Sequence, residues 1–404
     1  MVWAKRPPRN PHWHARAILP AILAAAALAG CGTSSVFPPR PLLPLASALP
    51  VERVWTRVNR LDDAPGQILL PLSHVQGRLY WTDSGNILHA VDSHSGRNVW
   101  HYRSDLPLIS GVGGDDSLLL VGSRDGDVLA LDPAQGTLRW RSRVSSEVLG
   151  PRQHGSGTGI AYAVDGKVFA LDAQTGKIRW QFDTQVPLLT LRGLATPRIV
   201  DDRVLVGLAN GRVLALQLSD GKNLWSTEVA PARGRSEIER LVDVDATPLV
   251  LGDVAYCVAF QGQVTAISIA TGRVLWAREL SSTADMAYDD EALYVTSPDG
   301  SLTALTRSTG EILWRQDALQ YRYVTGPARL GEYLIVGDIE GYMHWLDRHT
   351  GNIVHRKRLD DAPIGSEPIV AGSQVFFLSR GGILDAWTLP NSPVTPSAAP
   401  GAAS

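Results

Sequence analysis

The feature that most constrains the fold is a stretch at residues 166–180, GKVFALDAQTGKIRW, which returns many times along the chain. Related stretches cover residues 86–100, 126–140, 211–225, 262–276, 300–314 and, more weakly, 341–355. Internal repeats outrank single residues in deciding a fold, because each copy is one supersecondary unit that packs on its neighbours.

Each copy predicts a β-hairpin that closes on an aromatic residue. In residues 166–180 an apolar run, 168–171, is followed by a turn from Asp172 to Gly176, where glycine accommodates positive φ. The second strand ends at Trp180, and the same position in the other copies holds Trp100, Trp140, Trp225, Trp276, Trp314 and His355. A period of about 40 residues with four short strands is typical of propeller blades. We expect these tryptophans to pack between blades rather than to stack on a cofactor.

The two ends of the repeat region complement each other. Residues 51–55 look like the end of a repeat without its beginning, whereas residues 367–387 supply three strands and no fourth. The sequence therefore predicts an all-β protein, an eight-bladed β-propeller of four-stranded antiparallel blades over residues 51–389. Its last blade is closed by the N-terminal strand, which removes exposed sheet edges. The Pro-, Ser- and Ala-rich residues 390–404 are predicted to be a disordered tail.

Residues 1–30 have the pattern of a signal peptide. Four basic residues precede a short apolar run that ends in Leu28-Ala29-Gly30, immediately before Cys31. This ending resembles the bacterial lipobox, which implies that Cys31 carries the lipid anchor and begins the mature chain. Gly32 follows, with no aspartate to suggest inner-membrane retention, so the resemblance favours the outer membrane, facing the periplasm. Residues 31–50 would be the lipidated N-terminus and Pro-rich tether. The alternative is an ordinary signal peptide followed by a chance cysteine.

Charge and cysteine content narrow the range of possible functions. The net charge of −2, with no concentrated basic surface, argues against nucleic-acid binding. The second cysteine, Cys257, lies in a strand-like apolar run and is expected to be a buried small hydrophobe. Acidic pairs at 115–116, 201–202 and 289–290 recur at one turn position, which predicts solvated turn residues rather than catalytic carboxylates. We expect no metal site, no cofactor and no catalytic residues.

The repeat pattern G-x-[VL]-x-A-[LI]-x-x-x-[ST]-G-x-[IVL]-x-W resembles the pyrroloquinoline-quinone-type propeller repeat. That repeat occurs in quinoprotein dehydrogenases and in the BamB family of outer-membrane assembly lipoproteins. Two further stretches resemble BamB segments: residues 187–193, PLLTLRG, and residues 234–248, GRSEIERLVDVDATP. With the lipobox and the compact size, they favour the BamB family. The alternative is a lipid-anchored quinoprotein dehydrogenase, which would be expected to carry an adjacent cysteine pair that this chain lacks.

The two special stretches precede the first strands of consecutive blades. Equivalent connections of neighbouring blades emerge on one face, so we expect them to lie side by side. The family resemblance implies a non-enzymatic scaffold that binds the POTRA region of BamA and helps deliver unfolded barrel proteins for insertion. It assigns partner binding to Leu189, Leu191, Arg192, Asp243 and Asp245. Leu189 and Leu191 would be apolar anchors and Arg192 a polar contact. The two aspartates would position Arg192 or meet a basic partner group; alternatively, they only brace the loops internally.

Overall fold

The computed structural model describes residues 37–45, 49–58, 71–150, 153–155, 157–191, 195–233, 235–236 and 238–389. The chain divides into two compact units, of which the first ends at Pro39 and the second begins at Arg40. The predicted signal peptide, Cys31, Arg192 and the predicted tail 390–404 lie outside the described residues. All regular elements within the described ranges are strands, and these ranges contain no helix able to cross a membrane.

The first four blades follow the chain in order, four strands to a blade. Their strands are β2 (Ser73–Val75), β3 (Arg78–Thr82), β4 (Ile87–Asp92), β5 (Asn98–Arg103); β6 (Gly113–Gly114), β7 (Leu119–Gly122), β8 (Asp127–Leu131), β9 (Leu138–Arg143); β10 (Gln153–Gly155), β11 (Thr158–Tyr162), β12 (Lys167–Asp172), β13 (Ile178–Asp183); and β14 (Arg198–Val200), β15 (Arg203–Gly207), β16 (Arg212–Gln217), β17 (Asn223–Glu228).

The remaining blades continue the pattern until the last one. Their strands are β18 (Leu249–Leu251), β19 (Val254–Val258), β20 (Gln263–Ser268), β21 (Val274–Glu279); β22 (Ala287–Tyr288), β23 (Ala292–Thr296), β24 (Leu302–Thr306), β25 (Ile312–Gln316); β26 (Ala328–Leu330), β27 (Tyr333–Gly337), β28 (Tyr342–Asp347), β29 (Ile353–Arg358); and β30 (Ile369–Ala371), β31 (Gln374–Leu378), β32 (Ile383–Thr388), β1 (Glu52–Val58).

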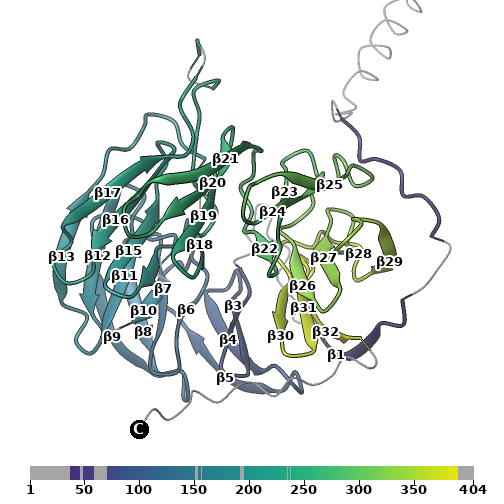
Figure 1. Ribbon diagram of the computed structural model, residues 1–404. Helices are drawn as coiled ribbons and strands as arrows, with labels where there is room; N and C mark the ends of the chain where they lie inside the picture. The colour runs from purple at the N-terminus through teal and green to yellow at the C-terminus, as the bar shows by residue number, and fades with distance from the viewer. Residues whose placement is uncertain are drawn as a thin grey trace, which may run out of the picture. The chain divides into compact units, whose positions relative to one another are not determined.

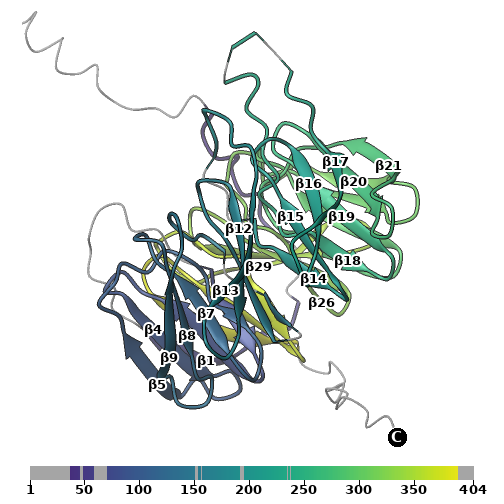
Figure 2. The same cartoon turned by 90° about the vertical axis from the view of Figure 1, so that its left-hand side faces the viewer.

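Together these sheets form the predicted eight-bladed propeller (Figures 1 and 2). Blade 8 is closed by the two ends of the repeat region, because β1 pairs antiparallel with β32, placing Trp55 opposite Ala386. The prediction that residues 51–55 complete this blade is thus confirmed, and the strand runs on to Val58. In Figure 1 the purple β1 lies beside the yellow β32, so the two ends of the repeat region meet within one blade.

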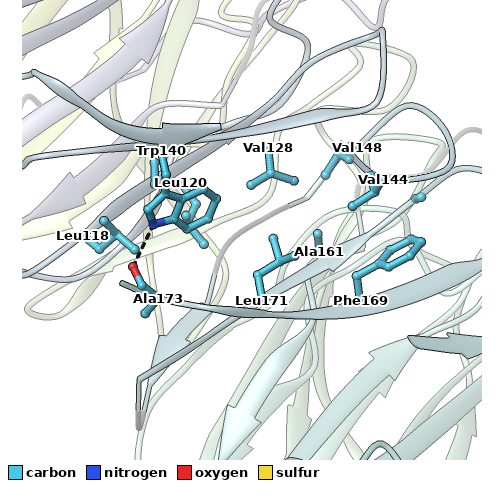
Figure 3. Close-up of a cluster of buried hydrophobic side chains, with 12 residues drawn as sticks. Leu118, Leu120, Val128, Trp140, Val144, Val148, Ala161, Phe169, Leu171 and Ala173 are labelled. Atoms are coloured by element: carbon cyan, nitrogen blue, oxygen red, sulfur yellow. Dashed lines mark hydrogen bonds between the residues drawn. The ribbon is translucent and has the colours of Figure 1, made fainter. Parts of the chain in front are cut away.

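The core lies between the blades rather than within a single sheet. Figure 3 shows one such layer, in which β7 and β8 of blade 2 face β11 and β12 of blade 3. Strands of this region are apolar on both faces and are buried nearly throughout: Leu120, Val128 and Leu171 are 0% exposed. Cys257 belongs to the corresponding layer between blades 4 and 5, where burial raises the pKa of its thiol to about 12.

The repeat tryptophans join each blade to the next. Each indole N–H donates to a backbone carbonyl in the turn of the following blade at 2.8–3.1 Å, as Trp140 does to Ala173 in Figure 3. The repeat glycine of that turn lies flat against the same ring. The pairs are Trp55–Gly96, Trp100–Gly136, Trp140–Gly176, Trp180–Gly221, Trp225–Gly272, Trp276–Gly310 and Trp314–Gly351. The repeat therefore encodes both sides of each blade interface.

His355 is the exception, and its position explains it. A tryptophan at 355 would need a glycine turn in blade 8. There the two outer strands, β32 and β1, come from opposite ends of the repeat region and share no such turn. His355 instead packs edge-on against Trp345 of its own blade, with ring centroids 5.1 Å apart. The repeat therefore lacks its tryptophan at the boundary where the following blade has no glycine turn against which the ring could pack.

Gly221→Ala is expected to destabilise the fold more than Gly77→Ala does. Both glycines have φ of 73°, but a Cβ at Gly221 would lie 2.7 Å from the Trp180 ring, whereas one at Gly77 meets nothing within 4 Å. The shared backbone strain costs about 1 kcal/mol, and the collision adds about 1–3 kcal/mol at Gly221 alone. Urea unfolding of both variants measures the difference; equal losses would contradict the packing role of this glycine.

The segment from Arg40 to Leu45, predicted as part of a tether, is held against blades 6 and 7. Its Arg40 amide donates to the Gln320 carbonyl at 3.0 Å, and the Arg40 guanidinium donates to the Asp317 carbonyl at 2.8 Å. In return, Arg322 donates to the Arg40 carbonyl and Arg356 to the Leu43 carbonyl. The side chains of Arg322 and Arg356 therefore hold the backbone of this segment in place.

A buried ionic network supports this clamp. Arg322, 2% exposed, donates through Nε to Asp338 at 2.7 Å, and His344 lies 2.9 Å from the same carboxylate oxygen. Arg356 donates to His344 Nδ1, so the His344 proton resides on Nε2 and points at Asp338. Burial lowers the pKa of His344, which keeps the imidazole neutral. Burial opposes ionisation of Asp338, but the hydrogen bonds from His344, the Tyr342 amide and Arg322 together outweigh it and lower the pKa of that carboxyl.

One turn prediction is wrong. Asp289 is not a solvated turn residue but 7% exposed, and it accepts hydrogen bonds from the Tyr294 hydroxyl and from Arg348 of the next blade. The sequence pattern shows an acidic turn but not the arginine, which lies 59 residues further along the chain, in the next blade.

Candidate functional site

Two connections between blades depart from the repeat, and the structure brings them together. The first joins β13 to β14 and contains Leu189 and Leu191; the second joins β17 to β18 and contains Asp243 and Asp245. The Leu191 amide donates to Asp243 Oδ2 at 3.3 Å, which links the two connections directly. The prediction that they lie side by side is confirmed for these residues.

The first connection presents apolar side chains to solvent. Leu189 and Leu191 are 42% and 38% exposed, and Leu188 is 99% exposed. The segment is fixed at its base, where Thr184 donates to the Gly166 carbonyl at 2.6 Å and Asn210 donates to the Gln185 carbonyl. A leucine pair on a short, anchored loop is suited to insert into an apolar groove of a partner. Sequence reasoning did not assign Leu188 to the site, although it lies within the recognised stretch 187–193.

The second connection contains a single helix-like turn with its own cap. Glu239 accepts the amides of Arg235 and Ser236, and the Ser236 hydroxyl accepts the Glu239 amide, which is a capping-box arrangement. The turn presents Ile238, 71% exposed, to solvent. Sequence reasoning missed Ile238 as well; an isolated apolar residue among charged ones was the available signal.

Asp243 and Asp245 are buried beneath these loops. They are 3% and 9% exposed and contact each other, beside a small cavity of about 40 Å³ that Tyr162, Val186 and Thr190 also line. Burial raises the pKa of both carboxyls, and the charge of Asp243 adds to the effect at Asp245, raising its pKa to about 8. The pair therefore holds a proton near neutral pH. This burial favours internal bracing of the loops over direct contact with a basic partner group.

Asp245→Asn is expected to gain stability relative to the wild type as pH rises from about 4 to about 8. The ordinary pKa of this carboxyl is 3.8, so between these values folding takes up a proton and wild-type stability falls with rising pH. Asparagine mimics the protonated form and removes that loss. Urea midpoints at pH 5 and pH 8 measure the effect, with the exposed Asp202→Asn as the charge control. Parallel pH profiles for wild type and Asp245→Asn would contradict the assignment.

No three His, Cys, Asp or Glu side chains of the described residues converge as a metal site. The site so described is a surface: exposed leucines and an isoleucine on two adjoining loops, held from below by a carboxyl pair. A family model for the outer membrane protein assembly factor BamB matches residues 83–316 and 310–389. The chain belongs to the BamB family.

Relatives and solved structures of the family cover nearly the whole chain. BamB of Alkalilimnicola ehrlichii is 38% identical over 93% of this chain and 97% of its own length. BamB of Escherichia coli K12 is 30% identical over 90% and 97%. The crystal structure of BamB from Moraxella catarrhalis superposes with a TM-score of 0.76 at 31% identity, covering 84% of this chain and 99% of that one.

A quinohemoprotein alcohol dehydrogenase from Comamonas testosteroni shares the fold alone. Its TM-score is 0.66 at 13% identity, covering 86% of this chain and 78% of that enzyme. Sequence identity therefore places this chain with the BamB assembly factors, and the propeller is what the two groups have in common.

Proposed function

We propose that this protein is a non-enzymatic subunit of the machinery that assembles outer-membrane proteins. The single observation that supports it best is the match to BamB assembly factors along nearly the full length of both chains. The two connections that depart from the repeat fit this role, because they present apolar side chains on a rigid ring. In this proposal the ring is anchored through Cys31 to the outer membrane and faces the periplasm.

The finer part of the proposal concerns the partner. Leu189 and Leu191 insert into an apolar groove on the POTRA region of BamA, and Leu188 and Ile238 extend the contact. Arg192 makes a polar contact beside them, and Asp243 and Asp245 hold the two loops in register from below. A groove of about 670 Å³ beside the second connection, lined by Arg233, Glu239 and Arg315 among others, gives the contact a polar rim. Unfolded barrel proteins are the clients delivered by the complex.

Purification in mild detergent tests the proposal. The tagged full-length protein is expected to bring BamA with it from solubilised membranes, and Cys31→Ser should lose its membrane association while retaining its fold. Recovery of the wild-type protein with other envelope proteins but without BamA would overturn the assignment of the partner. Dye reduction on addition of the quinone with Ca²⁺ would instead support a dehydrogenase.

A further inference from the structure

Exposed aromatic and aliphatic side chains lie where the N-terminal segment, residues 40–45, meets blades 6 and 7. The connection from β25 to β26, the next turn of blade 7 and the segment itself are joined by hydrogen bonds. The Ile339 amide donates to the Arg322 carbonyl at 3.0 Å, and the Arg322 guanidinium donates to the Arg40 carbonyl at the same distance. The exposed side chains, here called the tyrosine patch, are 36–72% exposed and are those of Leu43, Tyr321, Tyr323 and Ile339.

The backbone turns the two tyrosines of this patch outward. Tyr321 and Tyr323 have φ of 60° and 48°, and this left-handed conformation costs free energy in a bulky L-residue. Between them Arg322 is 2% exposed and donates to the buried Asp338. The turns on either side of the arginine therefore bury it and expose both rings. Such strain persists most often at functional positions, which favours a role for the rings at the surface.

The N-terminal segment has a fixed point beside the patch. Leu42 packs against the core layer between blades 6 and 7. The Arg40 amide donates to the Gln320 carbonyl, and its guanidinium donates to the Asp317 carbonyl. Cys31 is nine positions before Arg40, and nine extended residues span at most about 32 Å. A lipid on Cys31 therefore keeps Arg40, and the patch beside it, close to the membrane surface.

The carboxylates at the border of the patch are paired with arginines. Asp299 and Asp317 lie 3.4 Å and 2.8 Å from nitrogens of Arg315, and Glu340 pairs with Arg322. A paired carboxylate repels an anionic lipid headgroup less than an unpaired one does. The border of the patch therefore does not oppose contact with a phospholipid surface.

We propose that the tyrosine patch contacts the surface of the phospholipid bilayer to which the chain is anchored. This inference rests on the anchoring through Cys31 that is part of the proposed function. Tyrosine combines an apolar ring with a hydroxyl group, and it is enriched where proteins meet the membrane–water interface. A few such side chains bind lipid weakly by themselves, but a short tether keeps them at a high local concentration beside it.

The patch shares one face of the ring with the two connections that depart from the repeat. Tyr321 and Tyr323 lie on the connection from β25 to β26, Leu191 on the one from β13 to β14, and Asp243 on the one from β17 to β18. Each of these joins the outer strand of one blade to the inner strand of the next, so all emerge on one face. The contact with lipid therefore directs the exposed leucines toward the membrane.

Quenching of a fluorescent label by lipid tests this contact. Cys257 is 0% exposed, so Ile339→Cys supplies the one accessible thiol among the described residues. The full-length lipidated protein is reconstituted in vesicles of phosphatidylethanolamine and phosphatidylglycerol that carry a nitroxide on the headgroup. The label at position 339 is expected to lose most of its emission. Leu138→Cys, on the outer strand of blade 2 and 42% exposed, is the control and should keep its emission.

Tyr323→Glu is expected to remove the contact while the anchor remains. A carboxylate at this position is repelled by phosphatidylglycerol, so quenching at position 339 should fall to the level of the Leu138→Cys control. The protein should still sediment with the vesicles through Cys31. Tyr288→Glu is the matched control, because Tyr288 is a 43% exposed tyrosine on an inner strand, and it should leave quenching unchanged. Thermal melts establish that both variants are folded.

Three outcomes would overturn the contact with lipid. They are an unquenched label at position 339 in vesicle-bound protein, equal quenching at position 138, and shielding that appears only when the POTRA region is added. Release of the wild-type protein from vesicles by high salt alone would overturn the anchor and the contact together. Quenching at position 339 without recovery of BamA would support the contact and overturn only the partner in the proposed function.

Discussion

Leu191→Glu is expected to abolish recovery of BamA with this protein, while leaving the propeller folded. Leu191 is 38% exposed on the connection between blades 3 and 4, so a charge there costs little in the free protein. In the complex the carboxylate would be buried in an apolar groove. Loss of one buried anchor residue commonly costs 2 kcal/mol or more in binding, about 30-fold, and burying an unpaired charge adds to it.

The matched control is Leu138→Glu. Leu138 is 42% exposed, on the outer strand of blade 2, and lies outside both special connections. Pull-down of BamA from detergent extracts, followed by titration with its purified POTRA region, measures both variants. If Leu138→Glu weakened recovery as much as Leu191→Glu, a general surface effect would explain the loss. If neither variant did, the partner surface would lie elsewhere.

Arg322→Ala is expected to cost about 3–5 kcal/mol of folding free energy, because it leaves Asp338 buried without its cation. Arg322 and Asp338 are 2% and 0% exposed, and Arg322 also pairs with Glu340 and holds the Arg40 carbonyl. We therefore expect a second effect, which is faster hydrogen exchange at the Arg40 amide as the N-terminal segment comes away from blade 7.

The control for this prediction is Arg139→Ala. Arg139 also pairs with an aspartate, Asp132, but the arginine is 45% exposed, so its loss should cost no more than about 1 kcal/mol. Urea unfolding gives the free energies, and exchange followed by mass spectrometry reports on residues 40–45. Unchanged exchange in Arg322→Ala, together with a large loss of stability, would show that the network supports the blade but does not hold the segment.

The site was predictable in part. Leu189, Leu191, Asp243 and Asp245 were assigned through the resemblance of residues 187–193 and 234–248 to BamB segments, and the repeat itself predicts that the connections containing them are neighbours. What could not be predicted is how deeply each residue of these loops is buried. Alternate positions of a loop give no period from which burial follows, so nothing in the sequence separates the buried Asp243 from the fully exposed Leu188.

The buried polar contacts could not be predicted from the sequence, for a different reason. Asp289 meets Arg348, and Asp285 meets Glu367 through its amide, across separations of many tens of residues. Such contacts join residues of different blades, which lie together only in the assembled ring. Residue type and local spacing do not predict such contacts, whereas they do predict the turn in which Asp289 lies.

The repeat determined the blades, their number and the closure by residues from both ends, because a strand–turn–strand unit with tryptophan and glycine at fixed places specifies its own neighbours. Its exception at His355 follows from the same rule. Tertiary structure alone decided which acids are buried and how residues 40–45 are held. Local chemistry repeats along the sequence, but burial and charge pairing depend on distances that exist only in the assembled ring.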